Sequence, residues 1–160
     1  MKLLALLGVL SVPLFASAAL AGSTASGDGA LSVKSADGKV VVNGRGGVIG
    51  HIDKGQITIK DPNPNDGTGP IVNGADSTQS LGEHTTRYSG TNIRFRMIGG
   101  TFQITVYGTD IDMSVIGKGL VALDGTTSTL GTYAVNGETP QPFPAFRFTF
   151  PLAAPVSAGG

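Results

Sequence analysis

Apolar residues recur at every second position in short stretches, and this alternation constrains the fold more than any other feature of the chain. Ile57 and Ile59, for example, alternate with Gln56, Thr58 and Lys60. The same period of two occurs at 31–34, 40–42, 93–97, 102–107 and 146–150. Successive side chains of a β-strand point to opposite faces, so a period of two places one set in a core and the other in water. The pattern predicts half-buried strands.

Glycine-containing turn sequences separate these stretches. They include "ADGK" at 36–39, "NGRGG" at 43–47, "DKG" at 53–55, "IGG" at 98–100, "DG" at 124–125 and "NGE" at 136–138. Asp-Gly, Asn-Gly and Gly-Gly supply the positive φ that tight hairpin turns require. No helical spacing with capping residues follows the N-terminal apolar run. We therefore expect an all-β fold, either an antiparallel β-barrel or a two-sheet sandwich, of about 8–11 strands.

The chain also shows a weak internal repeat with an offset of 64 residues. "KGQITIKD" at 54–61 falls on "KGLVALDG" at 118–125, and the whole of Leu31–Asp61 aligns with Phe95–Gly125. The repeat predicts two copies of one β unit, at about 30–90 and 91–151, each covering the apolar face of the other. The alternative is a chance alignment, because any two alternating strand sequences in a Gly-rich chain can be placed in register.

The first residues have the parts of a secretory signal peptide. Lys2 precedes an apolar run, and small residues follow with cleavage positions after Ala18 or Ala21. An uncleaved anchor is the alternative, but Pro13 and the small residues favour cleavage. We expect a signal peptide at 1–21, a flexible leader at 22–29, a single β domain at 30–151 and a disordered tail at 152–160. The product would be secreted or held in the cell envelope.

Composition narrows the classes of function. Eleven basic and eleven acidic residues balance, and removing Lys2 with the signal peptide leaves ten against eleven. This balance gives no electrostatic reason to expect nucleic acid as a partner. No later stretch predicts a membrane span. The chain has no cysteine, so packing alone must stabilise the roughly 139 residues after cleavage, which suffice for one core.

One loop contains several oxygen ligands in a row. In "DPNPNDGTGP", Asp61, Asn63 and Asn65 are spaced like the first ligands of a calcium loop. The sixth position holds Asp66 instead of glycine, and the twelfth holds Val72 instead of glutamate. The pattern favours a stiff connection between strands, with a weak metal site as the alternative. We predict no metal and no cofactor.

Candidates for catalysis are few. His51 has Asp53 two residues later, and Asp110 and Asp112 would share a face of a strand. Paired carboxylates can hydrolyse glycosidic bonds, so a hydrolase of envelope polymers is an alternative function. The sequence context of a serine or cysteine nucleophile is absent. No residue is assigned as catalytic, and the sequence argues against an enzyme without excluding one.

A group of basic and aromatic residues is the best candidate for a binding site. Arg87, Tyr88, Arg94 and Arg96 lie close together in "RYSGTNIRFR", and Arg94 and Arg96 are expected on one face of a strand, opposite Phe95. Arginine forks and aromatic rings can hold a sugar ring or an anionic polymer. The alternative is the polar face of a half-buried strand, paired with acidic residues across the sheet.

Three stretches carry a resemblance to known sequences: "VIGHIDKGQITIKD" at 48–61, "YSGTNIRFRMIGG" at 88–100 and "GTDIDMSVIGKGLVALDG" at 108–125. There the chain resembles uncharacterised secreted proteins of high-GC Gram-positive bacteria. The likeness covers roughly Ala30 to Val135. It implies a bacterial, exported protein, and it brings no activity and no catalytic residues.

Together these observations predict a secreted or envelope-associated, non-enzymatic β domain that acts by surface binding or structural contact. Its partner would be a cell-envelope polymer or a protein. The second alternative, besides the hydrolase, is an exported subunit that assembles through β-strand edges. The sequence does not define the oligomeric state.

Overall fold

The computed structural model describes residues 27–155, which fold into one antiparallel sheet of six strands. They are β1 (Gly29–Lys60), β2 (Ile71–Gly82), β3 (Thr85–Asp124), β4 (Thr132–Val135), β5 (Gln141–Pro142) and β6 (Phe148–Leu152). The prediction of an all-β fold is confirmed. Among residues 27–155 there is no helix long and apolar enough to span a membrane. The predicted signal peptide, 1–21, lies outside the described residues, as do 22–26 and 156–160.

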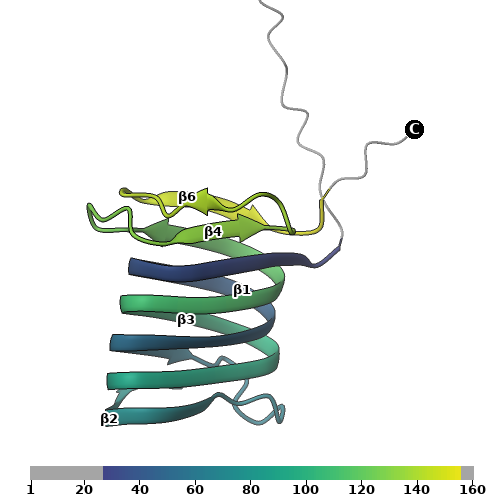
Figure 1. Cartoon of the computed structure of the whole chain (residues 1–160). Coiled ribbons are helices and arrows are strands. Elements are labelled where there is room, and N and C mark those ends of the chain that lie inside the picture. Colours follow the sequence, from purple (N-terminus) through teal and green to yellow (C-terminus); the bar gives the residue numbers. More distant parts are fainter. Residues whose placement is uncertain (1–26, 156–160) are drawn as a thin grey trace, which may run out of the picture.

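β1 and β3 wind around each other as one long antiparallel pair (Figure 1). β1 contains 32 residues and β3 contains 40. Central residues of β1 pair with β3 on both edges: Val40 lies opposite Val106 on one side and opposite Leu123 on the other. The second contact is seventeen residues further along β3, so β3 completes one turn of the coil between the two.

The coil places two layers of the same sheet face to face. The front layer in Figure 1 contains β4, residues 30–34, 48–52, 93–98 and 111–116, and the start of β2 at 71–73. The rear layer contains β6 and residues 39–45, 56–60, 85–90, 101–107 and 119–124. Val48 and Met97 point inward from the front layer, and Val42 and Ile104 point inward from the rear layer; all four are buried. Since each layer covers the apolar face of the other, both share one hydrophobic core.

The expectation of a barrel or two-sheet sandwich with about 8–11 strands is wrong in the number of strands and in the closure of the sheet. The structure has one sheet of six strands, and it is not closed into a barrel. The reason is that four of the turn sequences, at 36–39, 43–47, 53–55 and 98–100, lie inside β1 and β3, where the chain bends and continues. Of the six turn sequences, only "DG" at 124–125, which begins at the last residue of β3, and "NGE" at 136–138, which follows β4, stand at the ends of strands.

Glycines form the corners where the two long strands pass between layers. A Cβ built on Gly108 would lie 2.3 Å from the carbonyl oxygen of Lys54, and one on Gly44 would lie 2.2 Å from that of Lys118. Both distances are far inside van der Waals contact. Only a residue without a side chain lets the neighbouring turns of the coil approach so closely.

The corners also give the 64-residue offset a geometric meaning. Gly44 and Gly108 differ by this offset, and so do the Lys54 and Lys118 carbonyls that they approach. At the centre of the rear layer, Val41 pairs with Thr105, again 64 residues away. The two aligned segments therefore occupy equivalent places on the two strands of the coil.

Short elements cover the upper end of the coil in Figure 1. β4 extends the front layer, β6 extends the rear layer, and β5 pairs with β4. The rings of Tyr133, Phe148 and Phe150 contact one another with centroids 5.4–6.2 Å apart. Phe143, between β5 and β6, is buried in the core. This end of the core is thus covered by aromatic side chains.

β2 forms the opposite end of the sheet and turns directly into β3. The two-residue turn is Glu83-His84, with φ of 47° and 58°. Positive φ at both positions is the type I′ geometry that suits the twist of a hairpin. Lys60 Nζ lies 3.0 Å from the Glu83 carboxylate, so the end of β1 is tied to this turn.

This salt bridge leads to a prediction about Glu83. The hydrogen bond from Lys60, and secondly its charge, lower the pKa of Glu83. We expect Lys60→Met to raise that pKa toward its ordinary value, whereas Lys54→Met should leave it unchanged. Because the folded-state pKa is depressed, the pair stabilises the fold above the unfolded-state pKa, and this contribution disappears as the pH falls through the folded-state pKa. NMR titration of the Glu83 carboxyl group measures the shift; an unchanged pKa in Lys60→Met would contradict the pairing.

Candidate functional site

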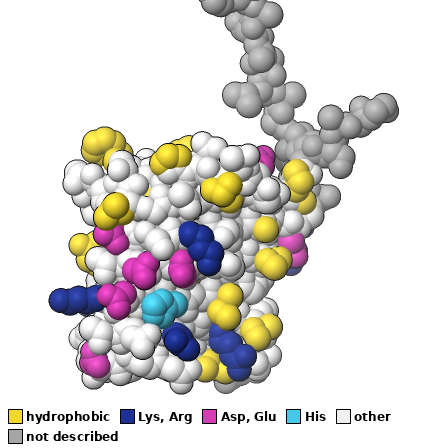
Figure 2. Space-filling view, viewed as in Figure 1, with side chains coloured by type: hydrophobic (Ala, Val, Ile, Leu, Met, Phe, Trp, Pro, Cys, Tyr) yellow, Lys and Arg dark blue, Asp and Glu magenta, His cyan; other side chains and the backbone are white. Residues whose placement is uncertain are grey.

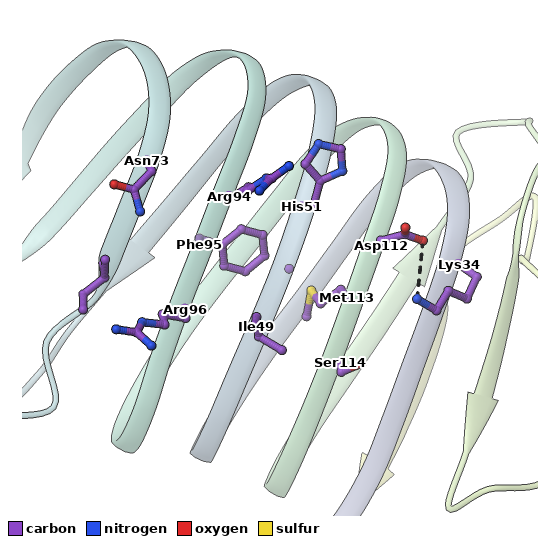
Figure 3. Close-up of a pocket in the computed structure, with 12 residues that line it drawn as sticks. Lys34, Ile49, His51, Asn73, Arg94, Phe95, Arg96, Asp112, Met113 and Ser114 are labelled. Atoms are coloured by element: carbon purple, nitrogen blue, oxygen red, sulfur yellow. Dashed lines mark ion pairs between the residues drawn. The ribbon is translucent and has the colours of Figure 1, made fainter.

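The outer face of the front layer carries three rows of side chains that run across the strands. They form because paired residues on neighbouring strands point to the same face, about 4.8 Å apart. The polar row, shown in Figure 3, consists of Lys34, Asp112, His51, Arg94 and Asn73. The mixed row beside it consists of Ser114, Ile49, Arg96 and Ile71. The apolar row consists of Ile116, Gly47 and Ile98.

Hydrogen bonds hold one half of the polar row in place. Asp112 Oδ1 accepts the backbone N–H of Ser35 at 3.0 Å and lies 3.9 Å from Lys34 Nζ. His51 Nε2 lies 2.9 Å from the side-chain oxygen of Asn92. An amide oxygen only accepts, so this bond forms in the tautomer of His51 that carries its proton on Nε2. The acid and the imidazole of this row are therefore already engaged within the protein.

Two shallow grooves lie on this face and meet. The first, of about 330 Å³, runs along the polar and mixed rows. The second, of about 260 Å³, runs along the mixed and apolar rows. Ile49, Arg96 and Ser114 line both grooves. In Figure 2, acidic side chains gather on the left of this face and hydrophobic side chains on the right. The joined grooves thus run from a charged end to an apolar end.

Of the charged groups that line the grooves, Arg94 and Arg96 have no side-chain partner within residues 27–155. Both are exposed. Within residues 27–155 neither guanidinium forms an ion pair with an acidic side chain, whereas Lys34 and Lys60 do. The alternative that these arginines pair with acids across the sheet therefore has no support in the described part of the chain. Each retains its full set of N–H donors for another molecule.

The structure brings Arg94 and Arg96 together and separates Arg87 and Tyr88 from them. Arg87 lies on the outer face of the rear layer, where it lines a different groove with Tyr107. Tyr88 points inward and packs against the core. The four residues proposed from the sequence do not form one contact surface.

The residues considered for catalysis are spread over the same edge of the front layer. His51 and Asp112 are directly opposite each other on neighbouring strands. Asp53 and Asp110 lie at the adjoining corner, where the Asp110 backbone N–H donates to Asp37 Oδ1 at 3.0 Å. The pairing of His51 with Asp112 could not be predicted from the sequence, because they are 61 residues apart. It brings an acid next to a base without a serine or cysteine in the same row.

The loop at 61–70 uses its own oxygens internally. Asp61 Oδ1 accepts the backbone N–H of Asn63 at 3.0 Å, and Asp66 Oδ1 accepts that of Thr68 at 2.9 Å. The Thr68 hydroxyl also donates to Asp66, and these bonds lower the pKa of Asp66. Such bonds are typical of Asx turns. In residues 27–155 no group of three or more His, Cys, Asp or Glu side chains is placed to hold a metal ion.

Sequence reasoning missed the isoleucines of this face. They are Ile49, Ile71, Ile98 and Ile116. Each stands next to an inward-facing apolar residue, as in Val48-Ile49 and Met97-Ile98, so the period of two is broken there. They could have been identified from the sequence as apolar residues at positions where the alternation predicts an outward-facing polar residue.

The chain was compared with protein-family models, with curated proteins and with solved structures, and none of the three comparisons gives a match.

Proposed function

We propose that this is an extracytoplasmic, non-enzymatic β domain that acts by binding a component of the cell envelope through the outer face of its front layer. The signal-peptide pattern supports the location. The Ile–Arg face supports the mode of action; it consists of Ile49, Ile71, Ile98, Ile116, Arg94 and Arg96.

The exposure of the four isoleucines is the observation that carries the proposal. Their exposed fractions are 60%, 47%, 70% and 64% for Ile49, Ile71, Ile98 and Ile116. A single exposed apolar residue needs no explanation, but a group of them around a groove is typical of binding surfaces. Arginine beside apolar side chains is also enriched where proteins bind partners.

The rear layer provides an internal comparison. The same coil exposes an outer face there, and the residues around its groove are polar or amphipathic, including Gln56, Thr58 and Thr105. The sheet itself therefore does not require isoleucine on an outer face. The rear outer face also exposes Leu120, at 53%, which does not line this groove, whereas four isoleucines line the joined grooves of the front layer. This difference supports a use of the front layer.

A sedimentation assay tests the proposal. The purified protein is mixed with isolated envelope fractions, and the bound fraction is measured against protein concentration. We expect saturable binding, and we expect the double variant Arg94→Ala/Arg96→Ala to weaken it at least about tenfold, because two charge-assisted contacts are lost. Arg87→Ala, on the rear layer, is the matched control and should bind as the unsubstituted protein does.

Two outcomes would contradict the proposal. Binding that is lost in Arg87→Ala and kept in the double variant would place the contact on the rear layer. Sedimentation of the folded protein without any envelope fraction would instead favour assembly through strand edges, with β2 at the open end of the sheet.

A further inference from the structure

The apolar row contains a notch with no side chain in it. Gly47 lies directly opposite Ile98 on one neighbouring strand and opposite Ile116 on the other. A Cβ built on Gly47 would have only one heavy atom within 4 Å, the carbonyl oxygen of Met97 at 3.8 Å. This glycine is therefore not required for close packing, unlike the glycines at the corners. Its effect is to leave open space between two exposed isoleucines.

We propose that the notch and the two arginines together bind a single-chain anionic amphiphile, an alkyl chain that ends in a carboxylate, sulfate or phosphate. This inference rests on the proposed function and specifies the ligand of the same face. The alkyl chain lies in the notch over Gly47, and the anionic head lies between Arg94 and Arg96.

The dimensions of the notch suit one alkyl chain. Strands are about 4.8 Å apart, so Ile98 and Ile116 stand about two strand spacings apart across Gly47. Carbon atoms in contact are separated by about 4 Å. One chain resting on the Gly47 backbone can thus contact both isoleucines, whereas two chains side by side would not fit between them. Ile49, two residues further along the strand of Gly47, lines the same groove together with Arg96.

The charges at the other end of the joined grooves select an anionic head. Arg96 lines both grooves, and Arg94 lies next to it in the first. In the described part of the chain, the single acidic residue lining either groove is Asp112, which is held by Lys34 and the Ser35 N–H. A carboxylate, sulfate or phosphate accepts hydrogen bonds from arginine in a forked geometry, and a neutral alcohol cannot replace that charge.

The test measures binding of sodium octanoate, decanoate and dodecanoate to the purified protein by calorimetry, below their micelle concentrations. We expect affinity to rise about three- to fourfold for each methylene that enters the notch. Decanol should bind at least about tenfold more weakly than decanoate. Equal binding of decanol and decanoate, or no dependence on chain length, would overturn the proposal.

Filling the notch provides the structural control. Gly47→Leu puts a side chain where the alkyl chain would lie, and it should weaken decanoate binding at least about tenfold. Thr58→Leu adds the same group to the outer face of the rear layer and should have no effect. Should Gly47→Leu fail to fold, Ile98→Ser/Ile116→Ser removes both walls at exposed positions and should weaken binding similarly. Unchanged binding in these folded variants would overturn the proposal.

A second experiment distinguishes binding of a dissolved amphiphile from binding to a bilayer. It also shows whether the amphiphile proposal can fail while the proposed function holds. Vesicles of phosphatidylglycerol and phosphatidylcholine are compared with vesicles of phosphatidylcholine alone. Binding to anionic vesicles without binding to dissolved decanoate would overturn the amphiphile proposal in favour of a membrane surface. Envelope binding that depends on Arg94 and Arg96, without decanoate binding, would overturn the amphiphile proposal and keep the proposed function. If the folded protein bound neither envelope fractions nor decanoate, the amphiphile proposal and the proposed function would both be overturned.

Discussion

Replacing Gly46 with alanine is expected to destabilise the protein by at least about 3 kcal/mol, a large part of the stability of a typical domain. Gly46 is at a corner of the coil with a φ of 131°, a conformation that residues with a side chain rarely adopt. A Cβ at this position would lie 2.1 Å from the carbonyl oxygen of Ile116 on the neighbouring turn. The substitution therefore forces both an unfavourable backbone and a clash that only separation of the two strands relieves.

The adjacent residue is a matched control for this prediction. The φ of Gly47 lies outside the positive range that residues with a side chain rarely adopt. A Cβ at this position would have no heavy atom closer than 3.8 Å. Gly47→Ala should change the free energy of unfolding by less than about 1 kcal/mol, and a gain is expected from the restricted unfolded chain. Urea unfolding, followed by circular dichroism, compares the two variants. Equal destabilisation by both would contradict the corner geometry.

This pair of glycines shows why the strand number could not be predicted from the sequence. "NGRGG" contains the residues of a hairpin turn, and in the sequence a hairpin and a corner look alike because glycine supplies the positive φ of either. What decides between them is a contact with Ile116, seventy residues away in the sequence. Local patterns contain no information about that partner. They do predict which faces point inward, because alternation with a period of two continues on both sides of a corner.

For the candidate site, too, the sequence predicts which face a side chain occupies but does not predict which distant residues lie beside it. Arg94 and Arg96 were expected on one face opposite Phe95, and the structure confirms it: both are exposed and Phe95 is buried. Tyr88 and Arg94 are only six residues apart, yet they belong to different layers because the chain turns a corner at Gly90, where φ is 155°. Closeness in sequence therefore did not give closeness in space. The notch at Gly47 was beyond prediction, since its walls come from two distant parts of β3.

The second large loss of stability is expected at the upper end of the coil, at Phe143. Phe143 is 1% exposed and belongs to the core cluster, although it lies in a loop between β5 and β6. Its backbone N–H donates to the carbonyl of Gly131 at 3.0 Å, and the next carbonyl, that of Pro144, accepts from Gly125 at 2.7 Å. These bonds fix the loop across the end of the core and direct the ring inward.

Phe143→Ala is accordingly expected to reduce the free energy of unfolding by about 3–5 kcal/mol, since a buried ring is lost and a cavity remains. Phe146 is the control: it lies in the same loop, but it is 75% exposed, and Phe146→Ala should cost no more than about 0.5 kcal/mol. Equilibrium urea unfolding of both variants, with the urea dependence of the free energy checked for agreement, measures the difference. Similar losses in the two variants would show that Phe143 does not cover the core. A loss confined to Phe143→Ala would show that a loop residue closes the end of a sheet that does not close on itself.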